Sequence, residues 1–295
     1  MDNIYDKLNE INQDNPKAYE PQYTKEEYAQ MKKEERQAVY DKAEAQTLNV
    51  VASPQNYLAY LSLQSRIDYT VTNTLLVMSE NPNATFLKDS AHWRENKIFP
   101  KKDEKGIEIL EPSGEFRRAD NSIGTNYNVK KVFDVSQMNT KNNFTKPPLS
   151  AQVLLSALTF KSPVNIRQQT TPLGKSVLYS KEENTIFFQP NLPINELLKG
   201  LVHEYCSAEF DKQYETRDNF IVDSSSYVLC QKYGITVDDT SFINNMNEHF
   251  NGLDSRAIKE ELNTIKGLAD DVNSRVELGI TSQKEQAKET RDMER

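Results

Sequence analysis

Apolar residues recur at helical spacing in the stretch that follows Ser53-Pro54. They step by three or four positions and so share one face of a helix: Tyr60, Leu63, Ile67, Val71, Leu75 and Met78. Ser53 is a favourable N-cap, proline is favourable at the first helical position, and Asn81-Pro82 is a stop signal. The pattern therefore predicts one long helix from Pro54 to about Asn81.

Shorter patterns lie on either side of this helix. Upstream, Thr24 and Glu27 have the spacing of a capping box and predict a polar helix to about Leu48. Downstream, short apolar runs broken by Lys, Gly and Pro predict a small β-rich unit, with a strand over residues 127–135. Residues 138–150 are polar and carry two prolines, so we expect a domain boundary there.

The second half alternates helical and strand patterns. We expect a helix near 153–158, strands near 177–179 and 185–189, a helix capped by Asn195, and another from Asp218 to Gly234. Residues 253–295 are charged and helix-forming, which predicts one packed helix and a frayed tail. The fold class expected is α+β in both halves, with helices flanking small mixed sheets.

These patterns divide the 295 residues into five segments, which suits a chain about twice the commonest domain length. The segments are a polar leader and helix (1–52), a first domain (53–137), a linker (138–150), a second domain (151–252) and a C-terminal helix with a charged tail (253–295).

Composition narrows the possible functions. The sequence has no run of about 18 apolar residues and its first residues are acidic and polar, so we expect a cytoplasmic protein without a membrane partner. Two cysteines exclude a disulfide framework. The net charge is −8, but residues 84–181 carry 16 basic and 9 acidic side chains, so an anionic partner fits the centre of the chain.

The segment LVHEYCS at 201–207 begins like the zinc-binding pattern H-E-x-x-H. In that pattern two histidines on one helical face hold zinc, while the glutamate polarises a bound water. Here Ser207 stands at the second histidine position, and a neutral hydroxyl is a poor zinc ligand. A site made of His203, Cys206 and Asp223 is chemically possible as an alternative. We expect no cofactor, or zinc at low occupancy.

A second group of residues suits single-stranded nucleic acid, because basic groups neutralise phosphates and flat rings stack on unpaired bases. Its members are Arg66, Tyr69 and Asn73, spaced three and four apart, and then Trp93, Arg94, Lys97, Lys101, Lys102 and Lys105. The alternative is that the tryptophan is a core residue and the lysines are simply solvated.

The stretch MSENPNATFLKDSAHWRENKIFPKKDEKGIEILEP, followed by YNVKKVFDVSQ, resembles the N-terminal domain of the ArdC-type antirestriction and LtrC-like proteins over residues 53–137. This resemblance implies a domain that binds single-stranded DNA, followed by a zincin-like metallopeptidase domain. LVHEYCS and DSSSYVLCQKYGI (223–235) fall at the family's H-E-x-x-H and ExxxYxxC segments.

Carried over by position, the resemblance assigns His203 as the first metal ligand, Glu204 as the catalytic general base and Asp223 as the third ligand. Ser207 replaces the second histidine, and Asp223 is a methylene shorter than the family's glutamate. The resemblance therefore implies a degenerate site with a vestigial base, that is, a pseudoenzyme.

Three functions follow. The first is a DNA-binding accessory protein of a mobile genetic element, which protects or escorts incoming DNA in conjugation or antirestriction. The second is an active zinc metallopeptidase with a rebuilt metal site. The third is an interaction module that binds a host or element-encoded protein through its acidic ends, without DNA.

Overall fold

The computed structural model describes residues 23–142, 144, 147–171, 174–238 and 240–293. The chain divides into two compact units, residues 1–38 and 39–295. In the described part of the first unit, helix α2 (Lys25–Val50) begins at the predicted capping box. The Thr24 N–H donates to Glu27 Oε2 at 2.8 Å, and the Glu27 N–H donates to Thr24 Oγ1 at 3.1 Å. The remainder of α2 belongs to the second unit.

The apolar stripe that predicts one helix is shared by two, α3 (Pro54–Arg66) and α4 (Val71–Glu80). Ser53 caps α3 as expected, but Ile67 is extended and Thr70 caps α4 by accepting the Asn73 N–H. The single-helix prediction is therefore wrong. Ile67 and Val71 are both buried, so the spacing of four is satisfied across the break and hides it.

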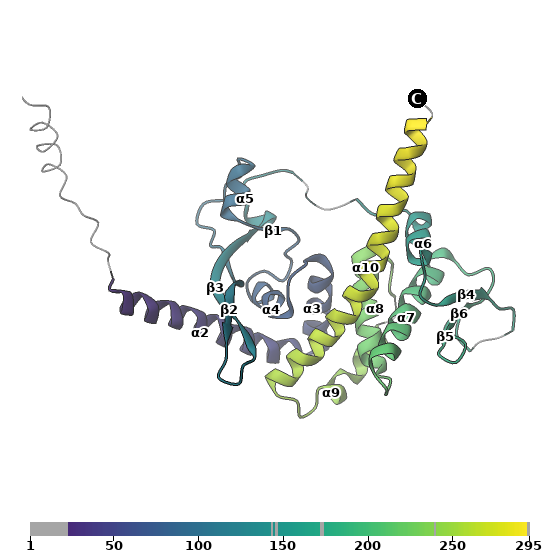
Figure 1. Ribbon diagram of the computed structural model, residues 1–295, viewed down its shortest axis with the longest axis horizontal. Coiled ribbons are helices and arrows are strands. Elements are labelled where there is room, and N and C mark those ends of the chain that lie inside the picture. Colours follow the sequence, from purple (N-terminus) through teal and green to yellow (C-terminus); the bar gives the residue numbers. More distant parts are fainter. Residues whose placement is uncertain (1–22, 143, 145–146, 172–173, 239, 294–295) are drawn as a thin grey trace, which may run out of the picture. The chain divides into compact units, whose positions relative to one another are not determined.

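A three-stranded antiparallel sheet follows, with strand order β1-β3-β2. It contains β1 (Leu87–Asp89), β2 (Ile107–Arg117) and β3 (Ile123–Asp134), with the short helix α5 (Ser90–Glu95) between β1 and β2. The predicted strand over 127–135 lies in β3. Only residues 132–134 of β3 pair with β1, so the far part of the β2–β3 hairpin extends as a two-stranded ribbon (Figure 1).

The chain continues with α6 (Ala151–Thr159) and a second small sheet of order β4-β6-β5. Strands β5 (Val177–Ser180) and β6 (Thr185–Phe188) confirm the strands expected there. Strand β4 (Asn165–Gln168), which runs parallel to β6, escapes prediction because Ile166 is its one apolar residue.

Two helices carry the candidate metal site, α7 (Ile194–Gln213) and α8 (Asn219–Tyr233). Helix α8 begins at Asp218 and ends at Gly234 in a left-handed conformation, as predicted. Asn195 does not cap α7, because the helix begins after Pro193. The Asn195 side chain instead forms hydrogen bonds with the backbone N–H and carbonyl of Thr236.

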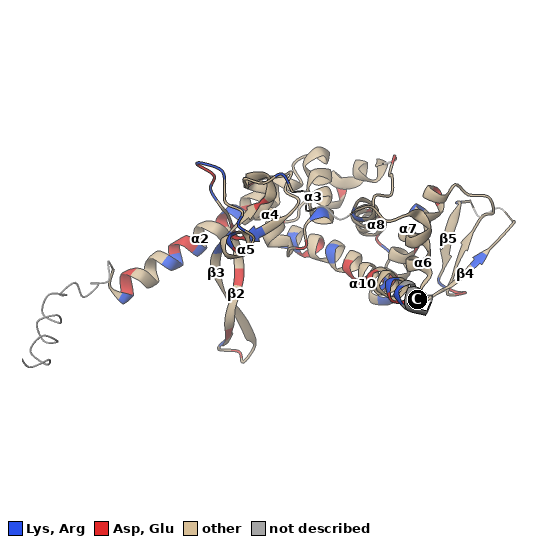
Figure 2. Ribbon diagram, turned by 90° about the horizontal axis from the view of Figure 1, so that it is seen from above, with Lys and Arg blue, Asp and Glu red and all other residues tan. Residues whose placement is uncertain are grey.

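After the short helices η2 (Ser241–Asn245) and α9 (Met246–His249), helix α10 runs from Ser255 to Met293, so helix replaces the expected frayed tail up to that residue. Basic and acidic residues alternate along α10 (Figure 2). One hydrophobic core takes residues from α3, α4, α6, α7, α8 and α10. The Tyr57 hydroxyl also bonds Ser224 Oγ at 2.8 Å, which links α3 to α8.

The α+β class is confirmed, while the domain boundaries stay a prediction. Within the described ranges, no helix has a segment that is both long and apolar enough to span a membrane.

Candidate functional site

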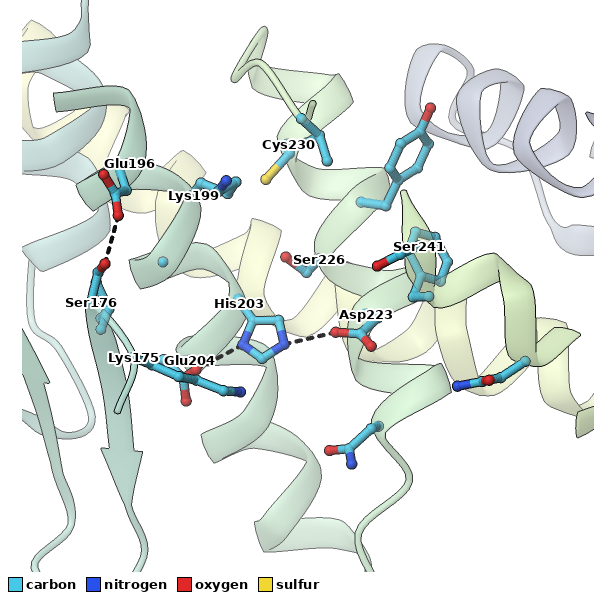
Figure 3. A pocket seen from close by; sticks show the side chains of 17 residues that line it. Lys175, Ser176, Glu196, Lys199, His203, Glu204, Asp223, Ser226, Cys230 and Ser241 are labelled. Carbon is cyan, nitrogen blue, oxygen red and sulfur yellow. Dashed lines mark hydrogen bonds and ion pairs between the residues drawn. The ribbon is translucent and has the colours of Figure 1, made fainter. Parts of the chain in front are cut away.

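Neighbouring helices bring together the residues that the sequence marks as a metal site (Figure 3). His203 and Glu204 lie on α7, and Asp223 lies on the first turns of α8. His203 Nδ1 is 2.8 Å from Glu204 Oε1, and His203 Nε2 is 2.9 Å from Asp223 Oδ1. The imidazole thus bridges two carboxylates, and both of its nitrogens are engaged.

Glu204 is a buried anchor between α7 and the second sheet. Its side chain is almost completely buried, and its Oε2 accepts the Tyr179 N–H of β5 at 2.9 Å. Burial raises the pKa of Glu204, but the hydrogen bonds from His203 and Tyr179 outweigh burial, and the net pKa is lowered. Both carboxylate oxygens are therefore occupied by protein donors, which is a poor state for a base that must activate water.

The charge on His203 follows from its two partners. Burial lowers the pKa of the imidazole, but the hydrogen bonds to Asp223 and Glu204 outweigh it and raise the pKa to about 9. The ring is then an imidazolium at neutral pH, with N–H groups on both sides. A metal ligand needs a neutral imidazole with a free lone pair, which this arrangement does not offer.

Ser207, which stands at the position of the second histidine, is engaged in hydrogen bonds with other residues. Ser207 is fully buried, and its Oγ donates to the His203 backbone carbonyl at 3.2 Å. The same oxygen accepts a hydrogen bond of 2.7 Å from Arg217 Nη2. Arg217 lies in the connection between α7 and α8, directly before the cap of α8.

Cys206, the alternative third ligand, is also fully buried, and burial raises the pKa of its thiol well above the ordinary value. It does not line the cavity beside His203. In the part of the chain that the structure describes, no three His, Cys, Asp or Glu side chains are placed to hold a metal ion. The donor set therefore does not fit the metal that a zincin-like fold implies.

A cavity of about 780 Å³ opens beside this cluster. Its lining carries both charges and several hydrogen-bonding groups, including Lys175, Glu196, Lys199, Asn219, Asp223 and Ser226 (Figure 3). Sequence reasoning missed the two lysines and Asn219. Lys199 lies four residues before His203, one helical turn away, and this spacing could have identified it as a residue of the same helix face.

The expected nucleic-acid residues are placed in different surroundings. Lys97, Lys101, Lys102 and Lys105 are all exposed on the segment 96–106 between α5 and β2, which we call the basic loop, and Arg94 is exposed just before it. Among the described residues, none of the four lysines has a carboxylate partner. Phe99 in the same loop is 57% exposed.

Trp93 is a core residue, with only 1% of its surface exposed. Its indole N–H donates to the Phe133 carbonyl at 3.1 Å, and its ring makes edge contacts with Phe86 and Phe144. No face of the Trp93 ring is open to a base, and the exposed aromatic ring in this region is that of Phe99.

Arg66, Tyr69 and Asn73 do not all share one surface. The Arg66 guanidinium donates to the carbonyls of Pro82 and Ala84 and so holds the turn after α4. The Asn73 amide pairs with the backbone of Leu110, at the edge of β2, through two bonds of 2.9 Å.

Tyr69 and Asn73 line a second cavity of about 430 Å³ over the first sheet, together with Lys88, His92 and Lys130. None of the lysines of the basic loop reaches this cavity. Lys130 is also paired with Asp89 and Glu111, at 2.9 Å and 2.6 Å. The lysines of the basic loop and the Tyr69 cavity therefore do not form one common surface.

Comparison with known proteins gives a relationship in fold. No family model matches the chain, and no curated protein matches it in sequence. The metal-free crystal structure of the antirestriction protein ArdC from the R388 plasmid has a TM-score of 0.54 and 15% identity, over 80% of this chain and 98% of that one. The Mn(II)-bound structure of the same protein has a TM-score of 0.55 and 15% identity, over 79% and 97%.

The chain thus has an α+β fold like that of an antirestriction protein. The particular protein that it is similar to is ArdC, as the motifs at 78–137 and 201–235 predict, and the resemblance is confirmed at the level of the fold.

Proposed function

We propose that this chain is an antirestriction-type accessory protein of a mobile genetic element that binds single-stranded DNA and protects or escorts it. The observation that carries the proposal is the basic loop, which exposes four lysines and one aromatic ring on a single segment. The likeness to an antirestriction protein supports it.

The chemistry of the loop suits an unpaired strand. Exposed lysines neutralise phosphates wherever the strand passes, and an exposed ring stacks on a base without selecting its identity. The backbone of the loop is held at its middle and near its C-terminal end, because the Lys101 N–H donates to the Gln137 carbonyl and the Gln137 amide donates to the Lys105 carbonyl. The charges are thus displayed from a fixed segment, which reduces the entropy lost on binding.

The zincin-like part of the chain, which the resemblance places at residues 151–252, would catalyse no reaction. Its histidine is committed to two carboxylates and its glutamate is bonded at both oxygens, which argues against the peptidase alternative. Protection would follow from occupancy, because a strand coated by protein is withheld from nucleases and no bond is broken.

Fluorescence anisotropy with a labelled single-stranded oligonucleotide, repeated over a series of salt concentrations, tests the proposal. The variant replaces Lys101, Lys102 and Lys105 with Ala. The control makes the same change at three exposed lysines of the zincin-like part, Lys161, Lys181 and Lys232, so the net charge of the two variants is equal.

We expect the loop variant to reduce the slope of log affinity against log salt by up to about 2, at roughly 0.7 per phosphate contact, while the control keeps the wild-type slope. Equal slopes for the two variants would show that the loop is not the binding surface. If the wild-type protein does not bind at all, the interaction-module alternative takes the place of this proposal.

A further inference from the structure

Arg217 reaches the one position of the metal motif that has lost its ligand. Its Nη2 is 2.7 Å from Ser207 Oγ, and Ser207 is the residue that stands where the second histidine of H-E-x-x-H would be. The hydroxyl is fully buried, and its proton and one of its two lone pairs are engaged, because it donates to the His203 carbonyl and accepts from Arg217.

The same guanidinium also bonds a residue of the cavity wall. Arg217 Nε donates to Asn219 Oδ1 at 3.0 Å, and Asn219 lines the cavity beside Asp223. Arg217 therefore connects the interior of α7 with the first turn of α8. In a zincin-like site that connection would be made by a metal ion shared between two helices.

We infer that Arg217 takes over from the metal ion the link between α7 and α8 at this site, with Ser207 as its acceptor. A guanidinium stays protonated throughout the pH range of folded proteins, and its planar fork binds two acceptors at once. A divalent cation placed within a few ångströms of it would be repelled. Ser207, which stands in place of the histidine, and Arg217 thus form a single contact, and this contact keeps the site ordered without a metal ion.

This inference does not depend on DNA binding, and its test uses different measurements. The proteins compared are the wild type, Ser207→His, Arg217→Ala and the double variant. The control is Arg256→Ala, which removes a surface arginine that is paired with Glu260 on α10. Each is incubated with zinc or Mn(II), freed of unbound metal and analysed for metal content, and its Tm is measured with metal and with EDTA.

We expect the wild type to hold substoichiometric metal and to have the same Tm with metal and with EDTA. Arg217→Ala should lower the Tm by about 2–4 °C, because a buried acceptor loses a charged donor, while Arg256→Ala leaves it unchanged. The double variant should bind zinc near stoichiometry and gain Tm with it, because no guanidinium then competes at position 207 and the bound zinc displaces the protons of the two histidines. Ser207→His alone should take up several-fold less zinc than the double variant.

Stoichiometric metal in the wild type, with a Tm that falls in EDTA, would overturn the inference. So would equal zinc uptake by Ser207→His and the double variant, or no uptake by a folded double variant. If the double variant does not fold, equal Tm values for Arg217→Ala and Arg256→Ala would be decisive against it.

Discussion

Replacing Glu204 with alanine is expected to destabilise the protein strongly. In a working H-E-x-x-H enzyme this glutamate acts on water, and its loss removes activity. Here the carboxylate joins the His203 ring, which lies on its own helix, to the Tyr179 N–H of strand β5. Its loss would leave both donors without an acceptor in a buried region.

The magnitude follows from these two bonds. A hydrogen bond to a charged group contributes about 1.5–3 kcal/mol, so Glu204→Ala, which removes two, should lower the free energy of unfolding by about 3–6 kcal/mol. Glutamine has the same shape and keeps one acceptor oxygen, and we expect Glu204→Gln to cost about half as much. For a domain whose whole stability is about 5–15 kcal/mol, the alanine variant removes a large share.

Urea denaturation followed by circular dichroism measures these differences. The matched control is Glu183→Ala, an exposed carboxylate in the turn between β5 and β6, which should stay within about 0.5 kcal/mol of the wild type. The reasoning is refuted if Glu204→Ala is as stable as Glu183→Ala. It is also refuted if Glu204→Gln is less stable than Glu204→Ala.

Further predictions concern single residues elsewhere. By NMR, His203 should titrate with a pKa of about 9. Because this pKa is above the ordinary 6.5, the stability that the imidazolium contributes is complete below pH 6.5 and is lost as the pH rises through 9. A titration midpoint near 6.5 would contradict the bridging geometry. Trp93→Ala should lower the unfolding free energy by about 3–5 kcal/mol in urea. Phe99→Ala should leave that free energy unchanged but weaken single-stranded DNA binding by about 1–3 kcal/mol in anisotropy. Gly200→Ala would place a Cβ 2.4 Å from a β5 side chain and should cost about 1–3 kcal/mol, while Gly267→Ala on α10, where no atom is within 4 Å, should stabilise by about 1 kcal/mol.

The elements predicted best are those whose ends are fixed by local chemistry. Asp218 and Gly234 mark α8 because a capping carboxylate and a left-handed glycine act on the adjacent backbone alone. The break between α3 and α4 gives no such signal, because Ile67 and Val71 keep helical spacing across it. Periodicity reports which side chains are buried, and it does not report whether the backbone between them is continuous.

The candidate site was predictable only in part, for a related reason. His203, Glu204 and Asp223 belong to spaced motifs on two helices, and the structure brings them within hydrogen-bond distance. Arg217 lies in a connection and reaches Ser207 through a long side chain, a contact that no spacing rule describes. Composition likewise marked Trp93 as an aromatic group among lysines but could not tell its buried ring from the exposed ring of Phe99.

The motif residues that carry the family resemblance in the first domain mainly build its frame. Trp93 packs under the basic loop and bonds the Phe133 carbonyl, while Gln137, the last residue of VFDVSQ, caps a 3-10 turn and holds the loop at Lys101 and Lys105. Such residues are constrained by packing and by hydrogen bonds within the fold. The exposed lysines have no such structural constraint, and their charges are available to a ligand. A resemblance carried by the buried residues therefore predicts how the loop is held, while the proposed binding of a DNA strand rests on the lysines and on the salt dependence of their variants.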